Sequence, residues 1–241
     1  MIGFFPPDKR VIALHDIDNA GLFAEKMVWL ASRYEILPLD RLFLVPQARR
    51  TQVAITFDDG DATQYERAVP ILRSLRLPAT FFLCSGFIGL VEDEVRDFVC
   101  RRLRRTRILR PLTVLQARAM AHDPLFTIGS YTSRHADLGA VPPHEAIEIA
   151  MADKRSLEAM IGTSVRWFAY PFGRRSSIPN PPIGRALLAG GFSGACTIIP
   201  GPADGDDMSE IPRSCLDIHS SSFRWRLSLG RTYDWMRYVR D

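Results

Sequence analysis

The stretch QVAITFDDGDATQYERAVPILRSLRLPATFFLCSGFI, residues 52–88, contains a strand, a helix and a second strand in succession. Residues 52–57 and 79–88 are short apolar runs rich in β-branched and aromatic side chains, which is typical of buried strands. Residues 63–76 between them form an amphipathic segment that predicts a helix, with a kink at Pro70 because proline lacks a backbone donor. A strand, a crossover helix and a strand together favour two parallel strands.

The same alternation extends over the rest of the chain. Five further apolar runs are predicted to be strands, at residues 11–17, 126–132, 165–171, 192–199 and 211–219. Amphipathic segments at 20–34 and 143–162 predict helices, and the second is bounded by Pro142 and Gly162 as helices commonly are. The pattern therefore predicts an α/β, barrel-like fold of about seven parallel strands, in one domain that covers residues 1–241.

Composition narrows the function classes. The chain has 241 residues, 46% of them hydrophobic, a formal net charge of +4 and only three lysines among 31 basic residues. This skew toward arginine indicates genome composition rather than a nucleic-acid partner, and the sequence does not indicate the oligomeric state. The four cysteines have no metal-ligand spacing and are expected to be reduced thiols. Because no signal-peptide pattern or membrane-spanning run is recognisable, we expect a cytoplasmic location.

Candidate site residues close or follow the predicted strands at their carboxyl ends. They are His15, Asp16, Asp58, Asp59, Tyr131, His135, Tyr170, Pro171 and His219. In a barrel of parallel strands these ends face one mouth, where the chemistry takes place. Each residue also has a simpler interpretation: Asp59 could cap the next helix, and His135 could be an ordinary loop histidine. Their combination favours a functional site.

Five motifs carry a resemblance to a known family. They are TFDDG (56–60), GSYTSRHADL (129–138), RWFAYPFG (166–173), GFSGACTIIPG (191–201) and IPRSCLDIH (211–219). In order and spacing they resemble the motifs of the NodB-homology polysaccharide deacetylases, carbohydrate esterase family 4, over roughly residues 11–219. The resemblance implies a distorted (β/α) barrel. It also implies a hydrolase of linear, non-peptide C–N amide bonds that removes the N-acetyl group from an amino sugar.

The resemblance also implies roles for individual residues. Amide hydrolysis needs an activated water, a stabiliser for the oxyanion and an acid for the leaving amine. Asp58 would be the base, Arg166 would orient it, the backbone around Tyr170 would help to hold the oxyanion, and His219 would be the general acid. The expected metal positions are Asp59, His135 and Tyr131, and the expected substrate-binding positions are His15, Pro171, Phe172 and Gly173.

Tyr131 departs from the family pattern, which has histidine at the first position of this motif. The expected cofactor is a divalent metal, zinc above all, whose bound water has a lowered pKa. Imidazole is a good neutral ligand, whereas a phenol with a pKa of about 10 must first lose its proton. Three outcomes are open: Tyr131 binds as a phenolate or a water replaces it, His15 or Asp16 takes its place, or no metal is held.

Three functional hypotheses follow. The first is a metal-assisted N-deacetylase of intracellular glycan or glycolipid precursors, acting on a sugar nucleotide, a lipid-linked sugar or another amino sugar. The second is a catalytically weak or metal-free relative that binds a glycan or a partner. The third is a metal-independent amide hydrolase.

Two arginine-rich segments lie outside these motifs. Residues 101–110, RRLRRTRILR, are interpreted as the solvated face of a helix end, with a phosphate or membrane contact as the alternative. Residues 220–240 are predicted to form a C-terminal helix on which Trp225, Leu229, Thr232 and Met236 share one side. Packing of this side onto the barrel is the simpler interpretation. The alternative is a peripheral contact with the inner membrane.

Overall fold

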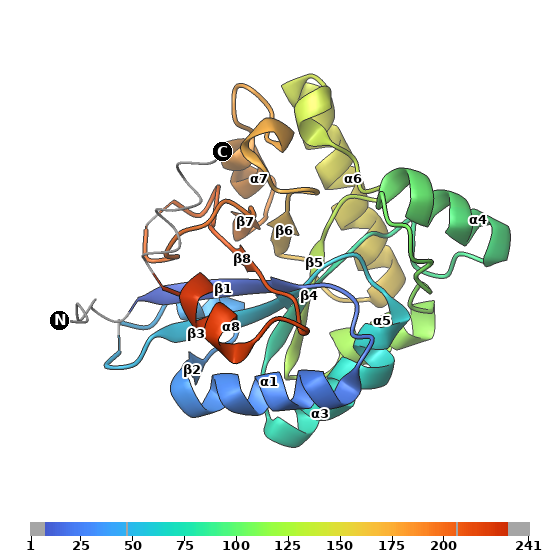
Figure 1. The fold of residues 1–241 in the computed structure, drawn as a ribbon. Coiled ribbons are helices and arrows are strands. Elements are labelled where there is room, and N and C mark those ends of the chain that lie inside the picture. The colour runs from blue at the N-terminus through green and yellow to red at the C-terminus, as the bar shows by residue number, and fades with distance from the viewer. Residues whose placement is uncertain (1–7, 47, 206, 231–241) are drawn as a thin grey trace.

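The protein, in a computed structural model that describes residues 8–46, 48–205 and 207–230, has a curled parallel sheet at its centre (Figure 1). The strands are β1 (Lys9–Leu14), β2 (Glu35–Ile36), β3 (Gln52–Phe57), β4 (Ala79–Leu83), β5 (Phe126–Ser130), β6 (Trp167–Ala169), β7 (Gly194–Cys196) and β8 (Ser214–Cys215). Their order is β7-β6-β5-β4-β3-β1-β8, with β2 paired to β3. The predicted α/β fold of about seven parallel strands is confirmed, as a half-barrel.

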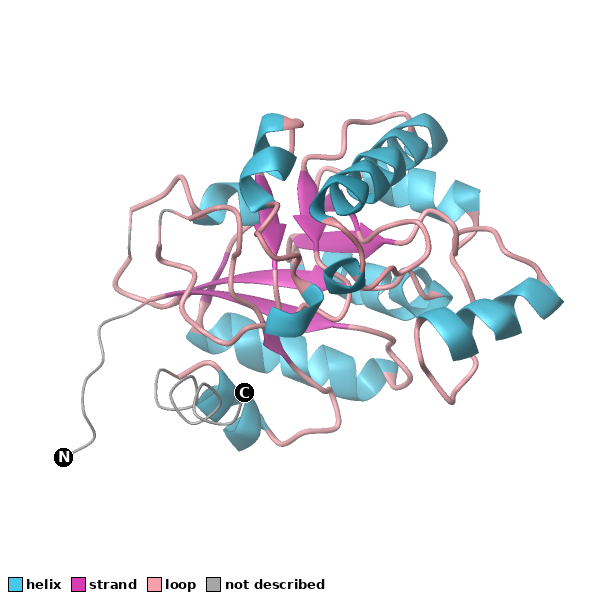
Figure 2. Cartoon of the chain, turned by 90° about the horizontal axis from the view of Figure 1, so that it is seen from above, coloured by secondary structure: helices cyan, strands magenta, loops and turns pink. Residues whose placement is uncertain are grey.

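The helices cover both sides of the sheet, as Figures 1 and 2 show. They are α1 (Ala20–Arg33), α2 (Leu39–Leu42), α3 (Val69–Leu75), α4 (Glu92–Asp97), α5 (Val114–Ala121), α6 (Pro143–Ile161), α7 (Gly184–Ala189) and α8 (Ser222–Ser228). A π-helical turn at Gln64–Ala68 precedes α3. Pro70 therefore lies in the first turn of α3, where no backbone donor is needed, and the helix predicted at 63–76 is divided next to the proline.

Strand register brings distant residues to the same end of the sheet. β1 pairs with β3 from Lys9 opposite Gln52 to Leu14 opposite Phe57, so the residues that follow both strands lie side by side. β4 pairs with β5 up to Leu83 opposite Ser130. Apart from β3, the predicted strands are shorter in the structure, because the chain leaves the sheet at these ends to build the loops of the mouth.

Aromatic side chains hold the centre of the core. Phe57 of β3 stacks on Phe81 of β4 with ring centroids 4.8 Å apart, and Phe23 of α1 meets Phe57 edge-on at 5.9 Å. All three are fully buried. Each such burial stabilises the fold by about 1.5–3 kcal/mol, so the strand that carries Asp58 is firmly positioned.

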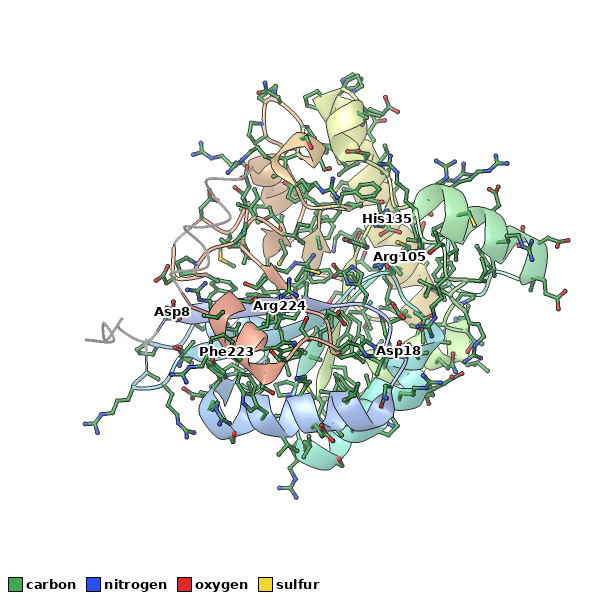
Figure 3. All side chains as sticks on the ribbon, viewed as in Figure 1. Asp8, Asp18, Arg105, His135, Phe223 and Arg224 are labelled. Carbon is green, nitrogen blue, oxygen red and sulfur yellow. The ribbon has the colours of Figure 1, made fainter. Side chains whose placement is uncertain are left out.

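The C-terminal helix begins as predicted and packs onto the fold. Trp225 of α8 is fully buried, donates a hydrogen bond to the carbonyl of Asp217 at 2.8 Å and meets Trp29 of α1 edge-on. Phe223 on the same helix is 69% exposed (Figure 3). The helix ends at Ser228 with Leu229 as its C-cap, so the prediction of one helix over 220–240 is wrong at 229–230, while Thr232 and Met236 lie outside the described residues. Within the described ranges, every helix is too short or too polar to cross a membrane.

Candidate active site

A cavity of about 510 Å³ opens where the parallel strands end. Asp59 comes to its wall from the end of β3, Tyr131 and His135 from the end of β5, Phe172 from the end of β6, and His15 from the end of β1. Figure 3 shows His135 and Arg105 close together in this region. The structure thus gathers these five predicted residues around one cavity.

Asp58, the expected base, lies behind this wall in an ion pair with Arg213. Arg213 Nη1 donates to Asp58 Oδ1 at 2.7 Å and Nη2 donates to Oδ2 at 2.9 Å, and both side chains are fully buried. Arg213 also donates to the hydroxyl of Thr56 and to the carbonyl of Thr197. A buried charge needs such a saturated set of partners, and the paired hydrogen bonds fix the plane of the carboxylate.

The prediction that Arg166 orients Asp58 is wrong. Arg166 stands immediately before β6, at the amino end of its strand, whereas Asp58 follows β3 at the carboxyl end. Its exposed guanidinium donates instead to Asp40 of α2 at 2.8 Å. Sequence reasoning missed Arg213, although an arginine inside the apolar run IPRSCLDI already indicated a buried charge in need of a carboxylate.

Asp59 and His135 face each other across the cavity wall. His135 Nε2 lies 3.7 Å from Asp59 Oδ1, and Arg105 Nη2 lies 3.6 Å from Asp59 Oδ2. The other ring nitrogen of His135, Nδ1, is 3.2 Å from the carbonyl oxygen of Arg102. A carbonyl can only accept, so Nδ1 carries the proton and Nε2 has a lone pair. Burial holds the pKa of His135 below its ordinary value, which keeps the ring neutral at pH 7.

These donors fit a catalytic zinc site only in part. Such sites use three protein ligands, and Asp59 and His135 supply two. The third expected ligand, Tyr131, is buried, and burial together with the charges of Asp58 and Asp59 raises its pKa well above the ordinary value. It is therefore a protonated phenol.

No group of three or more histidine, cysteine, aspartate or glutamate side chains is placed to hold a metal within the described part of the chain. Metal dependence is general in the family of the resemblance, but the residues present do not complete its site.

Phe172 reaches the cavity because of a tight loop after β6. Gly173 has φ +54°, and a Cβ at this position would lie 2.6 Å from the backbone nitrogen of Ile198. In this loop, which packs closely on Ile198, the ring centroid of Phe172 lies 4.5 Å from that of His135. Of the expected substrate-binding residues in this loop, Phe172 lines the cavity, while Pro171 and Gly173 are buried and shape the backbone.

Tyr170 does not lie in the cavity. Its fully buried side chain packs edge-on against Phe168, and burial raises the pKa of its hydroxyl. Its backbone N–H already donates to the carbonyl of Cys196 at 2.9 Å. The Tyr170 N–H is therefore not an oxyanion donor in this conformation, and the residue contributes to packing.

His219, the expected general acid, lines a neighbouring cavity of about 400 Å³. Its Nε2 is 2.9 Å from Asp18 Oδ1, and Arg107 approaches the same aspartate at 3.3 Å. The two cavities share His15, Arg105 and Cys215 as lining residues. The structure therefore places His219 next to the first cavity rather than in it, and its role as the acid stays a prediction.

His15 forms a pair with Cys215 between the two cavities. Its Nδ1 is 3.9 Å from the sulfur of Cys215. Burial works against the imidazolium, but the contact with Cys215 and the charge of Asp59 raise the pKa of His15 to about 9. Cys215 is exposed as a residue, but the desolvation of its sulfur works against the thiolate, and the contact with His15 lowers its pKa. The sequence analysis singled out His15 but not its partner.

The basic run at 101–110 is not a helix face along its whole length. The helical part ends at Arg102, and Arg104 has φ +54° in the loop that follows. Arg104 and Arg105 line the first cavity. Asp61 fixes the far end of this loop, since its Oδ2 accepts from the backbone N–H of Arg110 at 3.0 Å.

The chain belongs to the polysaccharide deacetylase family, because the model of that family matches residues 46–180, more than half of its length. The YxkH protein of Bacillus subtilis is 27% identical over 190 residues, which cover 76% of this chain and 60% of the relative. Poly-β-1,6-N-acetyl-D-glucosamine N-deacetylase of Staphylococcus aureus is 27% identical over 144 residues, 60% of this chain and 48% of that enzyme. The matched region thus spans about half to three fifths of these relatives.

Solved structures confirm the fold. IcaB from Ammonifex degensii superposes with a TM-score of 0.73 at 18% identity, covering 95% of this chain and 97% of the other. The deacetylase PplD of Streptococcus pyogenes, solved in complex with acetate, has a TM-score of 0.72 at 17% identity and covers 94% and 100%. The family assignment and the barrel-like fold of parallel strands implied by the five motifs are both confirmed, and the distorted barrel is a half-barrel.

Proposed function

We propose that this protein hydrolyses the N-acetyl group of an N-acetylated amino sugar in an intracellular glycan or glycolipid precursor. The observation that carries the proposal is the cavity in which Asp59, His135 and Tyr131 meet, backed by the buried pair of Asp58 and Arg213. The S. aureus relative is named as a deacetylase of an N-acetylglucosamine polymer, which supports the substrate class.

The donor and acceptor groups around the cavity suit this reaction. His135 Nε2 can accept a proton from the attacking water, with Asp59 beside it to stabilise the imidazolium that forms. Asp58 is the base implied by the family pattern. Both of its oxygens accept from Arg213, so proton uptake by Asp58 would require a water to reach its remaining lone pairs. Because the metal ligands are incomplete, we assign no step to a metal.

Two further groups can serve the oxyanion and the sugar. Tyr131 keeps its proton at neutral pH and can donate a hydrogen bond to the oxygen of the tetrahedral intermediate, as oxyanion holes do. Asp137 lines the same cavity, and its Oδ1 is buried without a partner among the described atoms. A buried acceptor of this kind favours a ligand with hydroxyl donors, such as a sugar.

Acetate release from N-acetylated amino sugars tests the proposal. Asp59→Asn and His135→Gln should each lower kcat by about 10²–10⁴-fold, the range for a positioned proton-transfer group. The matched controls, Asp93→Asn and His144→Gln, change exposed side chains of the same kinds outside the cavity and should leave the rate unchanged. Unchanged acetate release in the two cavity variants would contradict the proposal. Binding of the sugars without any acetate release would favour the alternative, a glycan-binding relative.

The third candidate, a metal-independent amide hydrolase, is favoured by one observation, the protonated phenol of Tyr131 where the family has a ligand. Acetate release that persists after dialysis against a chelator would support it. Loss of acetate release on dialysis, with recovery on addition of zinc, would contradict it.

A further inference from the structure

The cavity carries more positive charge than the hydrolysis of a neutral amide requires. Three arginines line it, Arg104, Arg105 and Arg174, against two carboxylates, Asp59 and Asp137. Arg105 lies close to Asp59. Arg104 and Arg174 have no carboxylate within salt-bridge distance in the described ranges. Unpaired guanidinium groups around a cavity favour an anionic ligand.

Arg104 lies against the ring of Phe172, and Arg174 stands in the same loop as that ring. The guanidinium of Arg104 lies over the ring of Phe172, 4.6 Å from its centroid. Arg174 follows Phe172 by two residues in the same loop, and its carbonyl accepts from the backbone N–H of Ser177 at 2.9 Å. Both arginines therefore belong to the part of the cavity next to Phe172.

The backbone that carries each arginine is fixed. On the side of Arg104, the backbone N–H of Arg105 donates to the carbonyl of Val99 at 3.1 Å, and the side chain of Leu103 is buried. On the side of Arg174, a Cβ at Gly139 would lie 2.0 Å from the carbonyl oxygen of Ser176, which shows how closely the two loops pack. The charges are thus presented on an ordered surface.

Two hydroxyl groups complete the set of donors. Ser176 and Ser177 line the same cavity as Arg174. Hydroxyl and guanidinium donors together are the groups that bind phosphate oxygens, and arginine matches their geometry with two parallel hydrogen bonds. A carboxylate would satisfy one guanidinium, whereas a phosphate or diphosphate has enough oxygen atoms for two.

We propose that Arg104, Arg174, Ser176 and Ser177 bind the phosphate group of a phosphorylated amino sugar, whose N-acetyl group reaches Asp59 and His135 in the same cavity. This inference rests on the proposed function and adds the substrate class to it. The phosphate can belong to a sugar 1-phosphate, or to the diphosphate that joins a sugar to a nucleoside or to a prenyl lipid.

Calorimetric titration at low salt measures binding separately from catalysis. The probes are N-acetylglucosamine 1-phosphate, its uncharged methyl glycoside, and N-acetylglucosamine joined by diphosphate to uridine or to a short prenyl chain. We expect the phosphate-bearing sugars to bind at least about tenfold more tightly than the methyl glycoside, and the tightest of them identifies the carrier. Equal affinity for the methyl glycoside would overturn the inference.

Variants locate the binding site. The double variant Arg104→Gln/Arg174→Gln should remove the preference for phosphate and leave the affinity for the methyl glycoside unchanged. Arg101→Gln is the matched control, because Arg101 lies in the same basic run but is exposed and paired with Asp97 outside the cavity. A phosphate preference that survives in the double variant, or is lost equally in the control, would overturn the inference.

Acetate release and phosphate-dependent binding test the two proposals separately. Acetate release from neutral and phosphorylated sugars with equal kcat/KM would uphold N-deacetylation and contradict the phosphate site. Tight phosphate-dependent binding without acetate release would support the phosphate site and contradict N-deacetylation.

Discussion

Arg213 and Asp58 form two parallel hydrogen bonds, of 2.7 and 2.9 Å, although 155 residues separate them in the chain. The pair joins the residue before β8 to the residue after β3, with β1 between these two strands in the sheet. Since both groups are fully buried, neither can be solvated if the other is removed.

Arg213→Gln should lower the free energy of unfolding by about 3–5 kcal/mol, because it leaves the carboxylate of Asp58 buried and unpaired. Arg166→Gln is the matched control. It breaks a half-exposed pair with Asp40 and should cost less than about 1 kcal/mol. Urea denaturation measures both values, and equal losses in the two variants would contradict the burial argument.

Tyr131→His should create the third ligand beside Asp59 and His135. Zinc affinity, measured by competition with a chromophoric chelator, should rise more than about tenfold, since imidazole is neutral at pH 7 and the phenol is not ionised. Tyr131→Phe is the control and should bind zinc no better than the original protein. An unchanged affinity in the histidine variant would show that position 131 does not point to the metal position of the family.

Gly173→Ala should destabilise the fold by about 2–4 kcal/mol, because φ is +54° and the added Cβ would meet the backbone of Ile198. Gly162→Ala separates the two causes. Gly162 has φ +77° but open space around it, so only the backbone strain of about 1–2 kcal/mol applies. Thermal and urea denaturation of both variants measure the difference, which would vanish if the contact with Ile198 were unimportant.

The imidazolium of His15 should make stability depend on pH. Its pKa rises from 6.5 to about 9 on folding, so its contribution is fully present below pH 6.5 and is lost as the pH rises through 9. The difference in unfolding free energy between the original protein and His15→Gln should therefore be larger at pH 6 than at pH 9.5. His144→Gln, which changes an exposed histidine of α6, should show no such trend. A difference independent of pH would contradict the assignment.

Alkylation by iodoacetamide at pH 7 should modify Cys215 faster than Cys84 and Cys196. Cys215 is exposed and its pKa is lowered by His15, whereas burial raises the pKa of Cys84 and raises that of Cys196 to about 12. Mass spectrometry of tryptic peptides gives the three rates. His15→Gln should slow the reaction of Cys215, because the pKa of its thiol returns toward the ordinary value and less thiolate is present at pH 7. No effect of this substitution would refute the pairing.

The fold could be predicted because apolar runs and amphipathic segments alternate along nearly the whole chain. Strand β3 has the predicted bounds. Among the described strands, the two-residue β2 was not predicted, since it has no apolar run of its own. The lengths of β6 and β7 could not be predicted. Their apolar residues continue past the last paired position to build the mouth, and periodicity does not distinguish a buried loop from a buried strand.

The site was predictable where function depends on a residue following a strand. Asp59, His135 and His15 were found by this argument, and the cavity gathers them. The same argument weighs against Arg166, which stands near the amino end of its predicted strand. Position along a strand does not decide alone, since Arg213 also precedes its strand, β8, and still reaches Asp58. The true partner of Asp58 depends on the order of the strands in the sheet. The residues near Asp58 or Arg213 in the sequence do not indicate this order.

The hydrogen bond between Asp61 and the backbone of Arg110 limits which changes the loop at residues 103–110 can accept. Backbone groups of Gly60 and Ala62 also bond to Leu112 and Arg110, so this loop is tied to the turn that carries the paired aspartates. An insertion there would disturb the turn that carries Asp58 and Asp59. Under the proposed function, a change of sugar specificity is therefore expected from side-chain substitutions around Arg174, in the loop after β6, which leave these bonds and the position of Asp59 intact.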